Sequence, residues 1–542
     1  MTPKRIRMSA ITSLAVVGLV SQAIAQAPRL VPRLFHAADR CVACHNGVLS
    51  PRGEDISFGS DWGPSMMANA ARDPYWLASV RRETLVHPVA AAAIENECAA
   101  CHMPMARFEA KAEGQMGVVF GNLQGARAIS PMGVLAVDGV SCSMCHQIQD
   151  KGLGQPSSFT AGFAVDTAAA FGKRQAFGPY KIDEGRQALM RSSAQFIPAE
   201  VTYIRESEVC ATCHTLFTHS LDADGRPVGV LPEQVPYLEW RHSAYPGSRS
   251  CQSCHMPAVD GEVPITGVMG QPRAGVARHV FRAGNFFMPR ILNAYRGDLN
   301  TAALPRDLEA AARDTVDHLQ TSSATVAVDS AEIKDGRLEA RVSLQNLAGH
   351  KLPSAYPSRR AWIHFTVRNR FNRVVYESGA LNPDGSVSGN DNDASPDDFE
   401  PHYERIEKPD QVQVYEAILE GPDKKVTTVL LTGVRYIKDN RILPDGFDKA
   451  TAPEDIAVRG AALADGDFGA GGDRILFSVA VDGAQGPFEV RAELWYQPIG
   501  FRWAHNLAEQ DAAETRRFVS YYSSMSGQSA VMLAAGRAAF TP

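Results

Sequence analysis

The chain has 542 residues, of which 45% are hydrophobic and 21% charged, so about two or three domains with ordinary cores are expected. A formal net charge of -6 leaves no basic excess, which excludes a general nucleic-acid binder. Residues 1–25 predict a signal peptide, with an apolar run from Met8 to Val20 and the cleavage-type sequence Ala23-Ile24-Ala25; an uncleaved anchor is the alternative. We therefore expect a periplasmic or secreted protein with no transmembrane segment after signal cleavage.

All ten cysteines belong to Cys-x-x-Cys-His units, and none is left over for a disulfide framework. Two cysteines three residues apart lie on one side of a helical turn, so both thiols can add to the vinyl groups along one haem edge. The histidine returns to the same face, where a ring nitrogen can bind the iron. The pattern predicts five covalently bound c-type haems, at Cys41/Cys44/His45, Cys98/Cys101/His102, Cys142/Cys145/His146, Cys210/Cys213/His214 and Cys251/Cys254/His255.

Structural zinc and thioredoxin-like redox pairs also use the Cys-x-x-Cys spacing. Zinc needs a closed set of four ligands and does not require a histidine after every pair. Thioredoxin-like motifs are expected once per domain. Five repeats, each ending in histidine, therefore favour haem over both alternatives.

Each iron also needs a second axial ligand, unless that position is open. We predict His279, His350 and His87 in this role. His279 precedes a Gly-Asn pair that lets the chain turn close to a porphyrin face, and His350 lies in a loop between a glycine and a proline. His87 lies shortly before the second motif.

Methionine is the other common axial ligand, and Met66 and Met67 follow the first motif. Methionines in such a helix more often pack in a core, but the first haem needs a sixth ligand, so both remain candidates for it. His242, ahead of the fifth motif, is a further candidate. His36 and His219 have the same standing as His242, His364 is expected as a packed strand residue, and no haem argument applies to His318, His402 and His505.

The expected fold class is α+β. Residues 26–300 hold all five motifs and predict a pentahaem domain, helical or irregular, whose core is largely haem. Residues 301–322 predict a linking helix, 323–505 an antiparallel β-sandwich-like domain, and 506–542 a C-terminal helical segment. The β-rich runs are 325–328, 338–344, 362–367, 374–376, 412–419, 426–431, 475–481 and 488–496.

Two acidic loops occur in the β-rich region. Clustered oxygen ligands suit calcium, but the spacing matches no EF-hand, so solvated acidic loops are the alternative. The first loop contains Asn390, Asp391, Asn392, Asp393, Asp397, Asp398 and Glu400, and the second contains Asp465, Asp467 and Asp473.

With its motifs in place, the chain resembles the multihaem cytochrome c superfamily of the cytochrome c-552/c-554 type, in a pentahaem branch with a C-terminal β-rich domain. The resemblance implies closely packed haems, many with two histidine ligands, and it implies that His279 and His350 are distal ligands. Pentahaem nitrite reductases typically use a Cys-x-x-Cys-Lys motif, which this chain lacks. The stretches that carry the resemblance are Cys101-His-Met-Pro, Cys254-His-Met-Pro, Gly139-Val-Ser-Cys-Ser-Met-Cys-His, His279-Val-Phe-Arg-Ala-Gly-Asn, Gly349-His-Lys-Leu-Pro-Ser and Tyr496-Gln-Pro-Ile-Gly-Phe-Arg-Trp-Ala.

We therefore expect electron transfer through five haems to redox partner proteins. One alternative is an oxidoreductase in which an open haem acts on a small nitrogen, sulfur or oxygen species, with His402, Tyr403, Arg359 and Arg360 binding an anion or moving protons. Another is a subunit of an extracellular cytochrome polymer, an oligomer in which a neighbour's histidine ligates a terminal haem. The residues alone do not separate these roles.

Overall fold

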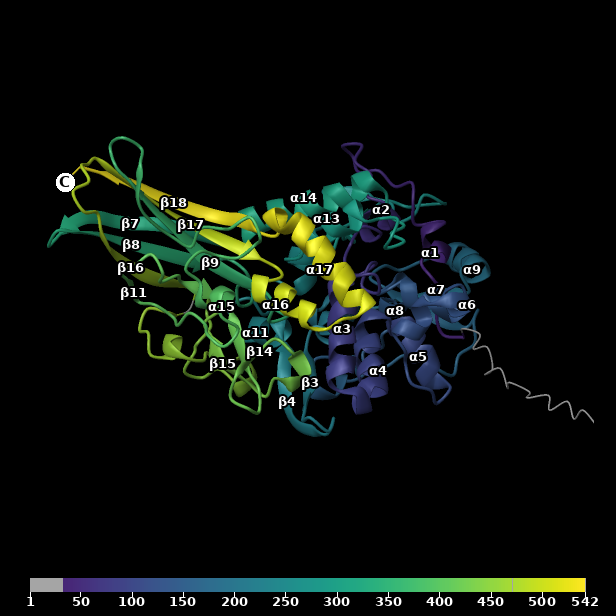
Figure 1. Ribbon diagram of the computed structural model, residues 1–542. Helices are drawn as coiled ribbons and strands as arrows, with labels where there is room; N and C mark the ends of the chain where they lie inside the picture. The colour runs from purple at the N-terminus through teal and green to yellow at the C-terminus, as the bar shows by residue number, and fades with distance from the viewer. Residues whose placement is uncertain (1–32, 470, 542) are drawn as a thin grey trace, which may run out of the picture.

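The computed structural model describes residues 33–469 and 471–541, so the expected signal peptide at 1–25 lies outside the described residues. Figure 1 shows two parts side by side, a region of short helices in purple to teal and a β-rich region in green and yellow. The predicted α+β class is confirmed. Within the described part of the chain, no helix combines the length and apolar character needed to cross a membrane.

The first part consists of short helices joined by loops and three small sheets. The helix α3 (Pro74–Val86) begins where the Asp73 carboxylate accepts hydrogen bonds from the backbone N–H groups of Tyr75 and Trp76, at 2.8 and 3.2 Å. The other helices are α1 (Asp39–Val42), α2 (Phe58–Trp62), α4 (Ala91–His102), α5 (Pro104–Ala112), α6 (Gly125–Ala128), α7 (Pro131–Val137), α8 (Cys142–Cys145), α9 (Glu184–Ser193), α10 (Ser207–Ala211), α11 (Pro236–Arg241), α12 (Cys251–His255) and α13 (Phe287–Ala294). The sheets pair β1 (Arg174–Gly178) with β2 (Phe196–Glu200), β3 (Leu216–Leu221) with β4 (Pro227–Gln234), and β5 (Glu262–Val263) with β6 (Arg273–Ala274).

The linking helix is α14 (Pro305–Ser322), and a β-sandwich follows it. One sheet has the order β10-β9-β17-β18 with β12 beside β9, and the other has the order β11-β16-β8-β7. Phe365 of β9 stacks on Phe477 of β16 with ring centroids 3.8 Å apart, so the inner faces of the two sheets interdigitate. The strands are β7 (Ala324–Lys334), β8 (Arg337–Asn346), β9 (Arg360–Arg368), β10 (Val374–Ser378), β11 (Arg405–Ile406), β12 (Val414–Tyr415), β16 (Gly472–Ala480), β17 (Phe488–Gln497) and β18 (Val531–Phe540). Beside them lie the short helix α15 (Asp391–Ala394) and a small sheet of β13 (Ala417–Glu420), β14 (Val426–Thr427) and β15 (Arg435–Asp439).

The end of the chain corrects the helical prediction for 506–542. Helices α16 (Phe501–His505) and α17 (Ala513–Met525) are present, but residues 531–540 form β18, antiparallel to β17. Alanine-rich sequence favours a helix in isolation. Here pairing with β17 satisfies the backbone hydrogen bonds and buries Leu533, so tertiary context overrides the propensity.

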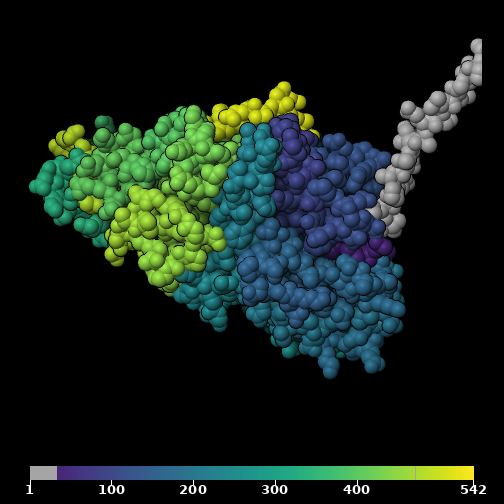
Figure 2. All heavy atoms as spheres, turned by 90° about the horizontal axis from the view of Figure 1, so that it is seen from below, coloured from purple at the N-terminus to yellow at the C-terminus, as the bar shows by residue number. Residues whose placement is uncertain are grey.

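The two parts are joined through α3 and α17. The rings of Tyr75 and Phe518 lie 5.1 Å apart, and the Arg81 guanidinium makes two hydrogen bonds of 3.0 Å to the Glu514 carboxylate. Figure 2 shows blue and teal atoms of the helical part against green atoms of the sandwich along a broad face. A large buried hydrophobic cluster extends from the sandwich into this join. The sandwich can therefore supply side chains to sites in the helical part.

Candidate functional site

A cavity of about 1100 Å³ extends through the helical part and reaches the sandwich. Its lining includes all ten cysteines and the five motif histidines. The cysteines are half-buried free thiols. Pockets for one drug-sized ligand measure about 300–1,000 Å³. The lining and the volume therefore indicate a site for more than one small group.

Each motif has the local geometry that its spacing predicts. The second and fifth motifs lie on α4 and α12. In the other three, the histidine N–H donates to the carbonyl of the first cysteine, at 3.0 Å for His45, 3.1 Å for His146 and 2.9 Å for His214. These helical bonds bring the imidazole back below the thiol pair. The five units are thus structurally equivalent.

Hydrogen bonds set the tautomer of four motif histidines. In each, Nδ1 bonds to a backbone carbonyl, which can only accept, so Nδ1 carries the proton and Nε2 keeps its lone pair. Histidines that bind metals use this arrangement. Burial lowers the pKa of both His102 and His255 to about 4, which keeps their rings neutral. The bonds are His45 to Ile265 (2.7 Å), His102 to Ala70 (3.1 Å), His146 to Phe177 (2.5 Å) and His255 to Arg282 (2.6 Å).

Two predicted second ligands lie at a characteristic distance from motif histidines. The ring centroids of His146 and His279 are 6.3 Å apart with planes at 18°, and those of His255 and His350 are 6.3 Å apart at 7°. Nδ1 of His279 and of His350 also bonds to a backbone carbonyl, at 3.1 and 2.9 Å. The structure brings both distal candidates to the cavity.

This separation fits two imidazoles that share one metal ion. A histidine nitrogen binds a metal at about 2 Å, as in zinc sites. The radius of the imidazole ring, from bonds of roughly 1.35 Å, is about 1.2 Å. Two rings on opposite sides of one ion therefore have centroids about 6.4 Å apart. The third and fifth motifs fit a haem iron with two histidine ligands.

His318 is a cavity residue for which the sequence offered no haem argument. Its ring centroid lies 6.2 Å from that of His255, with the planes at 70°. The cavity-lining positions of α14 are Ala311, Thr315, His318, Leu319 and Ser322. This helical spacing was visible in the sequence as one face of the linking helix. Nothing in the sequence showed which site that face would meet.

Five methionines line the cavity: Met66, Met67, Met144, Met190 and Met256. Trp62 Nε1 donates to the Val140 carbonyl at 2.9 Å, and Val140 N–H donates to the Met67 carbonyl at 2.9 Å. Met66 and Met67 therefore lie beside the third motif as well as after the first. Met190 lies on α9, whose Ser193 carbonyl accepts a hydrogen bond from Arg40, next to the first motif, at 3.4 Å. The sequence did not single out Met190, because α9 is distant from that motif along the chain.

Two predicted ligands lie away from the cavity. His87 Nε2 bonds to Thr432 Oγ1 at 3.2 Å, and His242 Nε2 bonds to the Asp448 carbonyl at 3.0 Å. Neither residue contributes to the cavity lining. Closeness in sequence to a motif therefore did not bring these side chains to the site. His36, His219, His364, His402 and His505 are likewise outside the lining.

The motifs lie side by side in a continuous array. A hydrogen bond with the Cys142 thiol raises the pKa of Cys41, and burial raises it further by a smaller amount. The first motif therefore lies beside the third. Cys213 does the same to Cys101, which places the second motif beside the fourth. A third contact, from Cys251 to Cys210, places the fifth motif beside the fourth. Burial, and after it the nearby Cys213 thiol, raises the pKa of Cys145 to about 12, so the third motif lies near the fourth.

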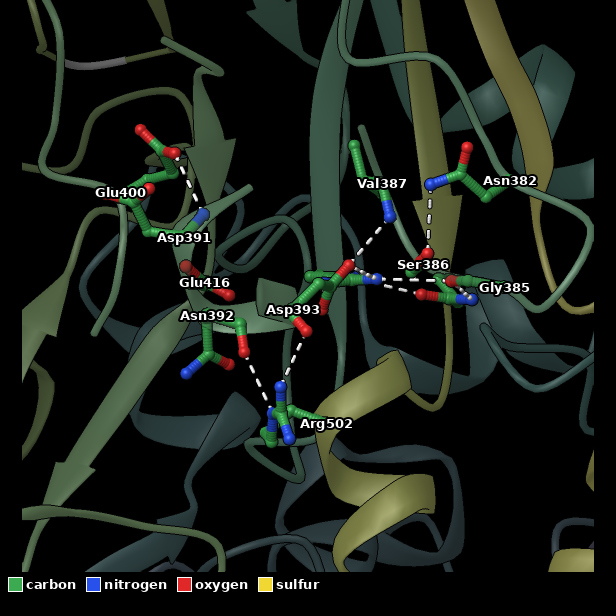
Figure 3. A network of polar contacts seen from close by, with 12 residues as sticks. Asn382, Gly385, Ser386, Val387, Asp391, Asn392, Asp393, Glu400, Glu416 and Arg502 are labelled. Carbon is green, nitrogen blue, oxygen red and sulfur yellow. Dashed lines mark hydrogen bonds and ion pairs between the residues drawn. The ribbon is translucent and has the colours of Figure 1, made fainter. Parts of the chain in front are cut away.

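The first acidic loop is held by arginines (Figure 3). Asp393 receives hydrogen bonds from Arg360 at 2.7 and 2.9 Å and from the Val387 N–H at 2.7 Å. Arg502 donates to the carbonyls of Asn392 and Asp393, at 2.8 and 2.6 Å. Asp393 is thus held in a buried ion pair with Arg360. Both arginines donate to loop oxygens that a calcium ion would need as ligands.

The second loop contributes to a buried group of His402, Asp465 and Asp473, whose potential ligand atoms lie within 4.8 Å of one another. His402 Nδ1 accepts hydrogen bonds from the side-chain amides of Gln413 and Asn440, at 2.8 and 3.2 Å. Nε2 therefore carries the proton, and it donates to Asp465 at 2.9 Å. Because no lone pair is left on this imidazole, the hydrogen bonds account for the group without a cation.

The fold and the site define an α+β protein with five thiol–imidazole units around one internal cavity. No protein-family model and no curated protein matches the sequence. Among solved structures, the chain is similar to a penta-heme cytochrome c552 from Thermochromatium tepidum, with 14% identity and a TM-score of 0.49. The match covers 93% of this chain and 99% of the other. Membership of the multihaem cytochrome c superfamily stays a prediction.

Proposed function

We propose that this chain is an exported pentahaem c-type cytochrome that carries electrons between redox partner proteins. The observation that carries the proposal is the separation of 6.3 Å in both the His146–His279 and the His255–His350 pairs. Both pairs border the cavity that all five cysteine pairs line. Thiols, neutral imidazoles and a shared cavity are the donor set that haem c requires.

Bound haem c supplies an iron that changes oxidation state without binding substrate. The chain's own residues prepare that site. Cysteine pairs would hold each porphyrin edge through thioether bonds, and the carbonyls of Ile265, Ala70, Phe177 and Arg282 orient the motif imidazoles. The apolar lining keeps water from the site, which helps to set the potential.

The neighbouring motifs define the route that electrons would take. Contacts between thiols connect the first motif to the third, and the fourth to both the second and the fifth. The third and fourth motifs are near enough for Cys213 to raise the pKa of Cys145, after the larger effect of burial. We propose that the fourth motif, at Cys210 and Cys213, is the branch point. An electron entering at the first motif could then leave at the second or the fifth.

Counting haems tests the proposal. Protein matured in a host that attaches haem c should carry five haems per chain, measured as haem content and as intact mass after denaturation. The double substitution Cys251→Ala and Cys254→Ala should remove one haem, because it removes both attachment points of the fifth motif. The matched control Ser253→Ala, between the same two cysteines, should keep all five. Wild-type protein with fewer than five attached haems would contradict the proposal.

A second candidate is an oxidoreductase with an open haem at the fourth motif. Arg359 lines the cavity, and its charge, after burial, lowers the pKa of His214. In the described chain, His214 has no second imidazole at the separation seen in the other pairs. Arg359 could hold a small anion there. Turnover of nitrite, hydroxylamine or sulfite that falls in Arg359→Gln would support this candidate, and a rate no higher than free haem would remove it.

A further inference from the structure

His255 has two imidazoles at the separation expected for a shared metal. His350 lies 6.3 Å away with the planes at 7°, and His318 lies 6.2 Å away with the planes at 70°. Both rings line the cavity. The third motif differs, since within residues 33–469 and 471–541 His279 is the one histidine outside the motifs at this distance from His146.

The two rings are held by different elements. His350 follows β8, where Asn346 Nδ2 donates to its carbonyl at 2.9 Å, and the next residue, Lys351, is buried and paired with Asp439 at 2.7 Å. His318 belongs to α14, which packs between α13 and the sandwich. Because neither ring depends on the other for its position, withdrawal of one leaves the second in place.

Both rings can act as ligands in their neutral form. Nδ1 of His350 bonds to the Lys351 carbonyl at 2.9 Å, which leaves Nε2 with its lone pair. A neutral His318 ring likewise has one nitrogen with a lone pair, and the ring lines the cavity at 6.2 Å from that of His255.

We propose that His350 is the sixth ligand of the fifth haem and that His318 is a reserve ligand for the same iron. This inference rests on the pentahaem function proposed above. In the exchange, His350 Nε2 would release the iron and a nitrogen of His318 would take its place; both rings would stay neutral, so no proton or electron would need to move. His350 is preferred over His318 as the sixth ligand, because its ring is nearly parallel to that of His255 and its Nδ1 is hydrogen-bonded to a backbone carbonyl. The fifth haem thus stays closed to small exogenous ligands even when the His350 loop moves away.

The test compares His350→Ala with the matched variant His279→Ala at the third motif. Haem content per chain is measured first, so that failure of the pentahaem assignment is seen separately. In the ferric protein, electron paramagnetic resonance should show one high-spin haem per chain for His279→Ala and none above wild type for His350→Ala. The double variant His350→Ala/His318→Ala should show one. Added imidazole should convert His279→Ala and the double variant to low spin and leave His350→Ala unchanged.

Two results would overturn the proposal. His350→Ala could show one high-spin haem like its control, which would mean that His318 does not reach the iron. His318→Ala alone could show one, which would make His318 the resident ligand. If His350→Ala fails to mature, His350→Gln preserves the shape of the side chain without a ligating ring, and the same two outcomes apply to it.

Discussion

The histidines of this chain differ in which ring nitrogen is hydrogen-bonded. At the cavity, Nδ1 of six histidines donates to a backbone carbonyl and Nε2 is left for a metal; these are His45, His102, His146, His255, His279 and His350. In the sandwich, His402 has the opposite tautomer, and both nitrogens of His364 contact carboxylates. The hydrogen-bond partners of each ring, more than its burial, separate the cavity histidines from those of the sandwich.

His364 makes stability depend on pH. Burial alone would lower its pKa, but hydrogen bonds to Glu493 and Glu377 outweigh burial and raise the pKa above the ordinary 6.5. A raised folded-state pKa contributes stability that is fully present below pH 6.5 and is lost as the pH rises through the folded-state pKa. We expect His364→Gln to be less stable than wild type below pH 6.5 and to converge with it in alkaline buffer. Denaturant unfolding below pH 6.5 and in alkaline buffer measures the free energy of unfolding under each condition. Exposed His505→Gln is the control. An equal loss of stability in His364→Gln under both conditions would contradict the prediction.

Arg360 and Asp393 form an ion pair whose side chains are 4% and 3% exposed. Removing the arginine leaves a buried carboxylate without its partner, so we expect Arg360→Ala to reduce the free energy of unfolding by about 3–5 kcal/mol. Exposed Arg370→Ala should change it by less than about 0.5 kcal/mol. Thermal unfolding of both variants measures the difference. A calcium-dependent melting temperature in wild type would instead show that this loop holds a cation.

Among the elements, β18 shows how position in the sheet overrides local preference. It pairs with β17 along its length, and it also meets β7 of the other sheet. Gly536 allows this contact, since a Cβ there would lie 2.9 Å from the Val326 carbonyl oxygen and 2.9 Å from the Ala327 Cα. The seam between the two sheets therefore requires a glycine at this position.

We expect Gly536→Val to destabilise the sandwich by about 1–3 kcal/mol, because its side chain meets backbone atoms that cannot move independently. Gly527→Ala is the control, since a Cβ there meets no atom within 4 Å. Denaturant unfolding of the two variants measures the effect. If Gly536→Val were as stable as the control, β7 and β18 would have to separate without cost, contrary to the packing described here.

At the scale of the whole molecule, the helical part surrounds a large cavity, whereas the sandwich has a continuous side-chain core. We expect chain produced without haem attachment to lose most hydrogen-exchange protection in residues 33–300 and to retain more in 323–500, because unfilled apolar cavities are destabilising. Comparison of haem-loaded and haem-free protein by hydrogen exchange measures this. Equal protection in both forms would show that the helical part does not depend on haem.

The sequence by itself determined the five Cys-x-x-Cys-His units, the second part of the chain as β-rich, and the helix at 305–322. These features are local, because a thiol pair, its histidine and a strand pattern each occupy a few consecutive residues. The partner of each motif histidine is different, since any segment that the fold brings near can supply a second imidazole. Sequence proximity therefore pointed to His87 and His242, which lie away from the cavity, and overlooked His318. Only the tertiary structure decided which histidines meet, because the 6.3 Å separation joins residues that the chain keeps far apart.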